Sequence, residues 1–328
     1  MENRVSKSPK LLDDLSGKNF LVAGAAGFVP SYVCENYLKK GARVVGLDNF
    51  ITGSKSNVEI LNNYENFDFH EVNIYESLPD FGDIKFDYIL SLASPASPID
   101  FKIIPLEIMR VNSEGTLNLL ELAKEHNSVF LEASTSEVYG DPEVHPQVES
   151  YVGHVNPIGP RSCYDESKRF AEAMTMSFKN KYNVDTRIIR IFNTYGPRMR
   201  PNDGRVIPNF INQALRGDDI TIYGDGSQTR SFSFVTDLVN AMEHVLMLGD
   251  HMPYNIGNPD EYSIKEAAEI IVKSIGSDSK LTYCDLPKDD PKRRRPVIDR
   301  VASLGYGPVV TFEEGLRETA EFFKNFRS

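Results

Sequence analysis

A short glycine-rich turn between two apolar runs is the feature that most limits how this chain can fold. The first run, Asn19–Ala23, leads into Gly24-Ala25-Ala26-Gly27, and a helical pattern follows from Ser31 to Lys40. The second run, Arg43–Leu47, ends at Asp48. The chain thus predicts a strand, a glycine turn, a helix and a second strand, with an acid about twenty residues after the glycines. This order is the pattern of a dinucleotide-binding unit.

Each residue of this unit has an expected role. Gly24 permits the tight turn, and Gly27 lets the backbone approach a pyrophosphate at the helix N-terminus. Asp48 would accept hydrogen bonds from the adenosine ribose and repel a 2′-phosphate, which favours NAD over NADP. Pro30 stands where the last glycine of the pattern is expected. Proline is tolerated in the first helical turn, so we expect dinucleotide binding with a slightly altered loop.

Further apolar runs and helical patterns alternate along the chain. The expected strands are Phe67–Val72, Asp87–Leu92, Val129–Ala133 and Thr186–Phe192, and the expected long helices are Pro105–Lys124 and Tyr164–Tyr182. Continuous apolar runs are typical of strands buried on both faces. The sequence therefore predicts an α/β fold with a doubly wound parallel sheet. Both long helices are apolar around much of their circumference, which indicates a central position or a subunit interface.

A change in amino-acid composition along the chain indicates the domain organisation. Residues 1–17 form a polar leader, compatible with a short helix near Leu11–Leu15, and residues 18–195 form the nucleotide-binding domain. Residues 196–328, rich in turn residues and arginine at their start, are expected to form mainly a smaller substrate-binding lobe. This lobe should interleave with the sheet near 233–258, because Tyr254–Gly257 reads as another short strand.

Charge and cysteine content narrow the class of protein. The formal charge of −11 argues against nonspecific nucleic-acid binding and against an anionic membrane surface, so an anionic ligand needs a local cluster of arginines. The three cysteines lie far apart, and no apolar stretch approaches membrane-spanning length. We expect a cytoplasmic protein without membrane contact. No histidine pair has convincing metal-ligand spacing, so we expect no metal site.

A tyrosine and a lysine one helical turn apart suggest acid–base chemistry. Tyr164 and Lys168 project from the same face of a helix because they are four residues apart. A free tyrosine has a pKa of about 10, which a neighbouring ammonium would lower toward neutrality. The pair is a weak signal alone and gains meaning from the upstream glycine turn.

With the glycine turn, Ser134-Thr135-Ser136 and the Tyr164/Lys168 pair in this order, the sequence resembles the extended short-chain dehydrogenase/reductases. The resemblance is most specific to the UDP-glucuronate decarboxylases, or UDP-xylose synthases, in the stretches Ala133–Gln147, Arg190–Met199 and Asp289–Pro296. It covers the chain from about Lys18 onward. The resemblance implies a Rossmann-type NAD domain, a small sugar-nucleotide lobe and a homodimer built on the two long helices.

The family's chemistry implies roles for six residues. Dehydratases of this superfamily place an aspartate beside the glutamate, whereas this chain has Ser136 before Glu137, which is the decarboxylase pattern. Tyr164, supported by Lys168 and Thr135, would act as the base. Arg294 would hold the sugar carboxylate. Glu137, with Ser136, would position the ring and assist protonation at C5. UDP-glucuronate would become UDP-xylose through a 4-keto intermediate with internal recycling of NADH.

The resemblance also implies the remaining binding residues. Those expected at NAD are Gly24, Gly27, Phe28, Val29, Asp48, Asn49, Phe50, Thr52, Gly53, Asn73, Ile74, Leu92, Ala93, Ser94, Asn112, Tyr164 and Lys168. Those expected at UDP-glucuronate are Pro95, Asn193, Arg198, Arg205, Val206, Asn209, Tyr223, Gln228, Arg230 and Arg294. The chain departs from the family pattern at Ser54, Ser56, Ser91 and Val297.

Two other functions remain open from the sequence. One is a different NAD-dependent sugar-nucleotide enzyme: an oxidative decarboxylase that stops at the 4-ketone, a 4,6-dehydratase or an epimerase. The other is a non-catalytic dinucleotide-binding regulator, which the intact Thr135, Glu137, Tyr164 and Lys168 argue against. The nucleotide base and the completeness of the redox cycle are not fixed by these residues.

Overall fold

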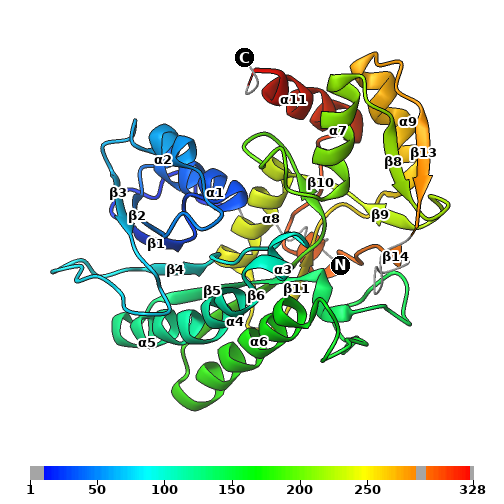
Figure 1. The fold of residues 1–328 in the computed structure, drawn as a ribbon. Helices are drawn as coiled ribbons and strands as arrows, with labels where there is room; N and C mark the ends of the chain where they lie inside the picture. Colours follow the sequence, from blue (N-terminus) through cyan, green and yellow to red (C-terminus); the bar gives the residue numbers. More distant parts are fainter. Residues whose placement is uncertain (1–10, 286–292, 326–328) are drawn as a thin grey trace, which may run out of the picture.

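A seven-stranded parallel sheet forms the centre of the structure, a computed structural model that describes residues 11–285 and 293–325 (Figure 1). Its strand order is β11-β6-β5-β4-β1-β2-β3. The strands are β1 (Asn19–Ala23), β2 (Arg43–Asp48), β3 (Phe67–Glu71), β4 (Tyr88–Ser91), β5 (Val129–Thr135), β6 (Asp185–Ile191) and β11 (Tyr254–Ile256). The order reverses between β1 and β4, so the predicted doubly wound α/β sheet is confirmed.

Helices cover both faces of this sheet. On one face lie α1 (Phe28–Lys39), α2 (Lys55–Leu61) and α8 (Val235–Leu248). On the other lie α4 (Pro105–Arg110), the π-helical turn η1 (Val111–Gly115), α5 (Thr116–His126) and α6 (Ser162–Tyr182). Alternation along β1 explains the two layers, because Phe20 and Val22 enter one core while Leu21 and Ala23 enter the other.

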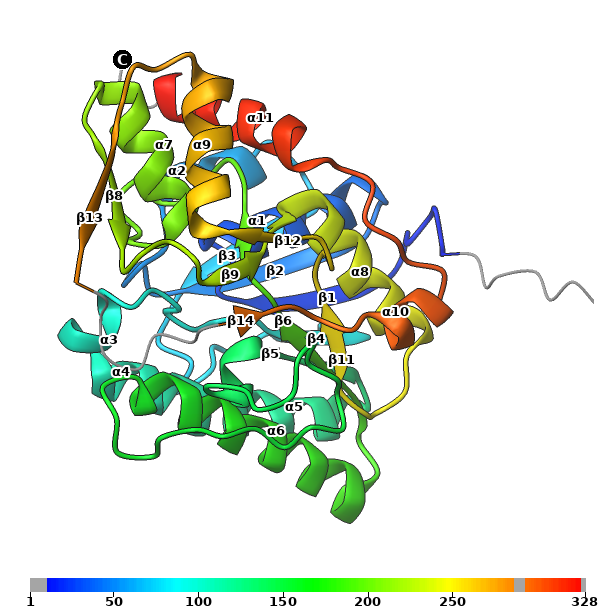
Figure 2. The same cartoon turned by 90° about the vertical axis from the view of Figure 1, so that its right-hand side faces the viewer.

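A second apolar core lies beside the carboxyl edge of the sheet (Figures 1 and 2). Its helices are α7 (Val206–Arg216), α9 (Ile264–Ile275) and α11 (Phe312–Asn325). Its strands are β8 (Ile220–Tyr223), paired with β13 (Leu281–Cys284), and β9 (Thr229–Ser231), which lies between β12 (Glu261–Ser263) and β14 (Arg293–Arg294). Two short strands, β7 (Thr194–Tyr195) and β10 (Ser233–Phe234), pair with each other.

The chain passes back from the smaller core to the sheet. After β10, α8 joins the core beside α1, and β11 pairs with β6. The short helix α10 (Asp299–Ser303) then contributes Val301 to the same core. The domain boundaries expected at residues 18 and 196 stay a prediction.

Three local expectations need correction. The segment near Leu11–Leu15 is not helical, because the Leu15 amide donates to Lys40 O at 2.7 Å and the Asp14 carboxylate accepts the Ser16 amide. The first helix begins at Phe28 rather than after Pro30. The helix expected over 105–124 is interrupted by η1.

Among the described residues, 11–285 and 293–325, no helix is both long and apolar enough to cross a bilayer. Within the same ranges, no cluster of three or more His, Cys, Asp or Glu side chains could hold a metal ion.

Candidate active site

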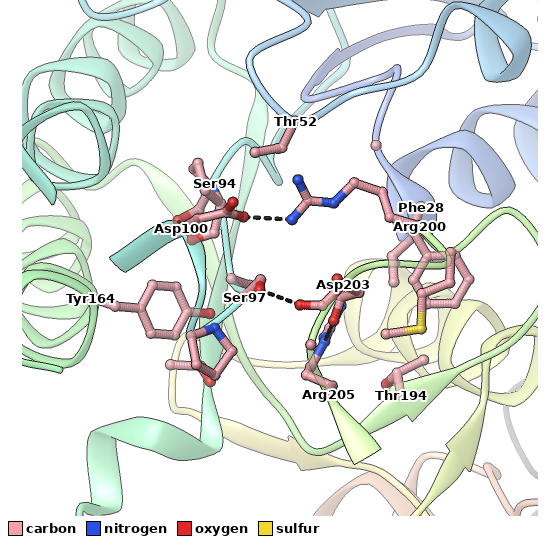
Figure 3. A pocket seen from close by; sticks show the side chains of 18 of the residues that line it. Phe28, Thr52, Ser94, Ser97, Asp100, Tyr164, Thr194, Arg200, Asp203 and Arg205 are labelled. Carbon is pink, nitrogen blue, oxygen red and sulfur yellow. Dashed lines mark hydrogen bonds and ion pairs between the residues drawn. The ribbon is translucent and has the colours of Figure 1, made fainter. Parts of the chain in front are cut away.

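A cavity of about 980 Å³ lies between the carboxyl ends of the sheet strands and the smaller core (Figure 3). Its walls include the glycine turn after β1, the residues following β2, β4, β5 and β6, and the start of α7. Carboxyl ends of parallel strands meet at one edge, and the crevice there is the usual ligand site of an open α/β sheet.

The N-terminus of α1 opens onto this cavity without a side-chain cap. Gly27 is the N-cap residue. Because glycine has no side chain, no side chain of this residue caps the helix. Gly24 has φ +87°, and a Cβ there would lie 2.8 Å from Ala93 Cα. Pro30 is the third helical residue, where an amide has no acceptor within a helix anyway. The amides of Gly24, Ala25, Ala26 and Gly27 already donate within the protein. The amides of Phe28 and Val29, at the N-terminus of α1, therefore suit a pyrophosphate.

Asp48 lies at the end of β2, next to the same turn. Its carboxylate accepts the Ala26 amide at 3.1 Å and the Phe50 amide at 2.8 Å. Burial raises the pKa of Asp48, and these backbone hydrogen bonds oppose the increase. Gly53 packs closely on the carboxylate, since a Cβ there would lie 2.8 Å from Oδ1. The surroundings thus fix the direction of the Asp48 side chain.

Tyr164 and Lys168 both line the cavity from the first turns of α6. The Tyr164 ring stacks on Phe101, with centroids 5.0 Å apart. Lys168 Nζ donates to Glu132 Oε1 at 3.1 Å and to Ala133 O at 2.7 Å. Its charge is therefore already paired with a fully buried carboxylate.

The expected pKa of Tyr164 needs correction. The sequence predicted a phenol with a pKa lowered by Lys168. In the structure burial raises the pKa of Tyr164, and a hydrogen bond with Thr135 opposes the increase only in part. The charge of Arg205 also lowers the pKa of Tyr164, whereas the charges of Glu137 and Asp165 raise it.

Glu137 shares its carboxylate between two arginines. Arg294 Nη1 donates to Oε1 at 2.8 Å, and Arg161 Nη2 donates to Oε2 at 2.5 Å. Burial opposes ionisation, but the two guanidinium groups lower the pKa of Glu137 to about 2. Arg294 is 1% exposed and also donates to Ser136 Oγ at 3.1 Å. The predicted catalytic residues Ser136, Glu137 and Arg294 thus form one hydrogen-bonded group.

A neighbouring carboxyl group has the opposite property. Asp165 is 6% exposed, and its Oδ1 has no hydrogen-bond partner among the described residues. Burial, followed by the charge of Glu137, raises the pKa of Asp165 to about 7.

A network of buried polar side chains holds the end of β5 in place. Glu172 accepts Ser134 Oγ at 2.5 Å and binds Arg190 through both of its oxygens. Arg190 donates to Tyr139 OH at 2.9 Å, and that hydroxyl donates to Asn255 Oδ1 at 2.7 Å. The network connects β5, α6, β6 and β11, so it holds the segment that carries Thr135 and Glu137.

Several predicted substrate residues come from the smaller core. Arg205, the N-cap residue of α7, binds the Asp203 carboxylate through Nε and, at 3.0 Å, through Nη2. Gln228 Nε2 donates to Tyr223 O at 2.6 Å. Arg198 has φ +65°, lies 4.2 Å from the Tyr32 ring and binds Glu35, so it contacts α1 as well as the cavity.

Most of the predicted residues meet at this one cavity. Its lining includes Gly24, Gly27, Phe28, Val29, Asp48, Asn49, Thr52, Asn73, Ile74, Leu92, Ala93, Ser94, Pro95, Thr135, Ser136, Glu137, Tyr164, Lys168, Asn193, Arg198, Arg205, Val206, Asn209, Tyr223, Gln228, Arg230 and Arg294. Phe50, Gly53 and Asn112 do not line it. Phe50 and Gly53 pack around Asp48, whereas Asn112 donates to Ser94 Oγ and Ser167 Oγ, both at 3.0 Å.

Sequence reasoning missed several charged residues of the site, among them Glu132, Arg161 and Asp203. Arg161 lies three residues before Tyr164, so its position near the start of the helix was a usable signal. Glu132 reads only as one polar residue within a buried strand. Nothing in its spacing from Lys168, 36 residues away, indicates a contact.

Comparisons with known proteins agree with this geometry. A family model described as GDP-mannose 4,6 dehydratase matches residues 21–319. A protein named UDP-glucuronic acid decarboxylase 1, from Xenopus tropicalis, is 47% identical over 96% of this chain and 74% of its own length.

Two solved structures are also similar. The first is a UDP-glucose 4-epimerase with UDP-glucose from Thermotoga maritima, with a TM-score of 0.86, 28% identity and coverage of 94% of this chain and 100% of its own. The second is a UDP-glucuronic acid 4-epimerase from Bacillus cereus in complex with UDP-glucuronic acid and NAD. Its TM-score is 0.82, with 26% identity and coverage of 94% of this chain and 99% of its own.

Proposed function

Because this chain belongs to the family described as GDP-mannose 4,6 dehydratase and, within it, to the UDP-glucuronic acid decarboxylases, we propose that it converts UDP-glucuronate to UDP-xylose with NAD. The observation that best supports the proposal is the group formed by Arg294, Ser136 and Glu137 in the cavity that Tyr164 also lines. Arg294 donates to Glu137 at 2.8 Å through Nη1 and at 3.5 Å through Nη2, and such a fork of donors suits a carboxylate on the substrate.

NAD would be held by the turn between β1 and α1 and by Asp48. The uncapped amides of Phe28 and Val29 would bind its pyrophosphate. Asp48 would accept hydrogen bonds from the hydroxyl groups of the adenosine ribose. When bound, NAD supplies reversible oxidation at C4 of the sugar.

The residues of this chain would handle the protons and the carboxylate. Tyr164 would accept the proton of the 4-hydroxyl, while Thr135 orients that hydroxyl and the phenol. Lys168, fixed by Glu132, would keep a positive charge one turn from the phenol. A ketone at C4 lies β to the C6 carboxylate, so carbon dioxide can leave while the electrons pass to the keto oxygen.

Arg294 and Glu137 would act as a linked pair. A substrate carboxylate that binds Arg294 competes with Glu137, which then keeps Arg161 as its guanidinium partner. Losing one of the two cations raises the pKa of Glu137 from its value of about 2. We propose that this change lets Glu137 take up a proton and assist protonation at C5, with Ser136 positioning the ring.

The diphosphate and uridine would lie against the smaller core. Arg205 and Arg230 would bind the diphosphate, and Asn193 the sugar or diphosphate. Tyr223, which is 47% exposed at the end of β8, would contact the uracil.

Incubation with UDP-glucuronate and NAD, followed by mass analysis of the nucleotide sugar, tests the function. We expect a product lighter than the substrate by carbon dioxide and identical to UDP-xylose, and no reaction of UDP-glucose. A product of unchanged mass would indicate 4-epimerisation, the activity in the name of the B. cereus protein, and would contradict the proposal.

We also propose that the protein is a homodimer through α4, α5 and α6. α4 and α5 follow one another through η1 and pack against α6, and these helices expose the apolar side chains of Leu106, Met109, Leu117 and Phe170. Sedimentation should give a dimer, and the double variant Leu106→Glu/Phe170→Glu should give a monomer. Val309→Glu, at a valine that is 79% exposed and lies outside these helices, is the control. A dimer that persists in the double variant would contradict this interface.

A cytoplasmic location stays part of the proposal. The three cysteines are free in the structure, which fits a reducing compartment. Fractionation of source cells with an antibody to the protein checks it, and recovery in a membrane-enclosed oxidising compartment would contradict it.

A further inference from the structure

Two chain segments meet across the cavity through contacts that the proposed chemistry does not use. Residues 95–103 follow β4 and include the short helix α3 (Asp100–Ile103). Residues 198–205 connect β7 to α7. Both segments line the cavity, and Figure 3 shows their side chains facing each other. We name residues 95–103 the β4 segment and residues 198–205 the α7 segment.

The two segments are joined by one ion pair and one hydrogen bond. Arg200 Nη2 donates to Asp100 Oδ2 at 2.6 Å, and Ser97 Oγ donates to the backbone oxygen of Asp203 (Figure 3). The Asp100 side chain is 9% exposed and that of Arg200 is 34% exposed. The pair joins a buried carboxylate to a partly exposed guanidinium through a charge-assisted hydrogen bond, so it holds the two segments together while one partner keeps contact with water.

Close packing adds a third contact between the segments. Gly204 has φ +86°, and a Cβ there would lie 2.5 Å from Ile99 Cδ1. The side chain of Ile99 thus rests against the bare backbone of Gly204. The three contacts involve residues 97–100 on one side and 200–204 on the other, in the same small area.

One residue of the α7 segment connects this junction to the ligand site. Asp203 is 4% exposed, and its backbone oxygen accepts the bond from Ser97. Its carboxylate binds Arg205, the N-cap residue of α7. Separation of the two segments would therefore displace the guanidinium of Arg205, which faces the cavity.

We propose that the β4 segment and the α7 segment form a latch, fastened by Asp100–Arg200 and Ser97–Asp203, that controls how long a nucleoside-diphosphate ligand stays in the cavity. The identity of the sugar rests on the proposed function, whereas the latch requires only a diphosphate bound near Arg205. For a decarboxylase, the latch would retain the 4-keto intermediate until it is reduced.

The dissociation rate of UDP tests the latch without catalysis. We would compare the wild type with Asp100→Asn, Arg200→Gln, Arg200→Lys and the double variant Asp100→Asn/Arg200→Gln. The control is Glu114→Gln, which breaks an exposed ion pair with Arg110 on the neighbouring helical segment. Melting temperatures would identify any variant that fails to fold.

We expect each neutral single variant to release UDP about three- to tenfold faster, because lost contacts act mainly on the dissociation rate. The double variant should release UDP no faster than the faster single variant, since both changes break one interaction. Arg200→Lys, which keeps the charge, and Glu114→Gln should stay close to the wild type. Folded single variants with wild-type UDP release, or a wild type that binds no UDP, would overturn the latch.

Product analysis then separates the latch from the proposed function. With UDP-glucuronate and NAD, the neutral latch variants should release a larger fraction of UDP-4-keto-pentose than the wild type does. If the wild type forms no carbon dioxide, the proposed function fails while UDP release still decides the latch. An unchanged product ratio despite faster UDP release would overturn the role of the latch in retaining the ketone.

Discussion

At the scale of single residues, the site pairs its buried charges with opposite charges. Lys168 binds Glu132, and this pair is almost wholly removed from water. Glu137 binds Arg161 and the buried Arg294, and the side chains of Glu137 and Arg161 are 18% and 19% exposed. Pairing is needed because an isolated charge in such surroundings would be very unfavourable. It also means that each side chain acts through a partner, so single substitutions at charged positions disturb two residues.

At Tyr164 a substitution can remove the reactive group and keep the packing of the ring. Tyr164→Phe keeps the ring that stacks on Phe101 and removes only the hydroxyl. We expect turnover of UDP-glucuronate to fall by about a hundredfold or more, because the general base is lost. The melting temperature and NAD affinity should change little. Wild-type turnover in this variant, measured under the same conditions, would remove Tyr164 from the mechanism.

Asp165 gives a prediction of pH-dependent stability. The pKa of its carboxyl group rises from the ordinary 3.8 to about 7 on folding, so the folded protein binds this proton more tightly. The resulting stability is fully present below pH 3.8 and is lost as the pH rises to about 7. Asp165→Asn resembles the protonated form, so it should match the wild type in acid.

Above pH 7 the variant should be more stable than the wild type by about 1–3 kcal/mol, less than the full shift because Asp165 is coupled to its neighbours. These neighbours are Glu137, Arg161, Arg294 and Glu166. Urea unfolding at pH 4.5 and pH 8.5 measures the difference. A wild type that is the more stable protein at pH 8.5 would show that Asp165 is ionised without penalty.

At the scale of elements, the turn between β1 and α1 tolerates a proline because of where the helix begins. With Phe28 as the first helical residue, Pro30 lies in the first turn and its missing amide leaves no acceptor unpaired. The buried ring lies beside Gly27, since a Cβ built on Gly27 would be 3.3 Å from Pro30 Cδ. Because the amides of Phe28 and Val29 precede the proline, we expect Pro30 to contribute to stability rather than to recognition of the dinucleotide.

Pro30→Gly separates these two effects. It should lower the free energy of unfolding by about 1–2 kcal/mol, because glycine gains chain entropy in the unfolded state. The NAD affinity, measured calorimetrically, should stay within about threefold of the wild type, since the first-turn amides that bind pyrophosphate are kept.

Gly27→Ala is the matched comparison, because a Cβ there would lie 3.0 Å from Gly24 O at the entrance to the helix. We expect it to weaken NAD binding by about tenfold or more, since it occupies the approach to the helix N-terminus. Strong loss of NAD affinity in Pro30→Gly instead would make Pro30 a recognition residue.

At the scale of the whole molecule, the cavity is bounded on one side by the sheet and on the other by the smaller core. The dinucleotide turn, the Tyr164 region and the arginines of the smaller core therefore share one enclosed space. Oxidation, loss of carbon dioxide and reduction can occur there in sequence only if the ketone stays until reduction. Retention is thus a property of the assembled lobes and of the latch between them.

The balance of NADH and carbon dioxide measures this retention. With UDP-glucuronate and NAD in excess, we expect UDP-xylose as the main product and a minor release of NADH with UDP-4-keto-pentose. Nicotinamide absorbance and released carbon dioxide, followed in the same reaction, give the ratio directly. NADH that accumulates mole for mole with carbon dioxide would contradict the closed cycle and indicate an oxidative decarboxylase.

Local sequence patterns determined the elements that position the cofactor end of the site. Strand periodicity, the glycine turn and the acid at position 48 all lie within a short stretch, so steric and hydrophobic rules for neighbouring residues are sufficient to predict it. The same holds for Tyr164 and Lys168, whose shared face follows from helical geometry. The sequence did not predict the short strands of the smaller core, because runs of two to four residues are too short to show the alternation of apolar and polar residues that indicates a strand.

Only the tertiary structure decided how the charges of the site are paired. Arg294 binds Glu137, which is 157 residues away in the sequence. Lys168 binds Glu132 in addition to lying one helical turn from Tyr164. Ion pairs form between the opposite charges that folding brings close together in a medium of low polarity. The spacing of residues along the chain does not predict which charges these are. For the same reason the pKa of Tyr164 rises with burial, although its sequence neighbours predicted a decrease.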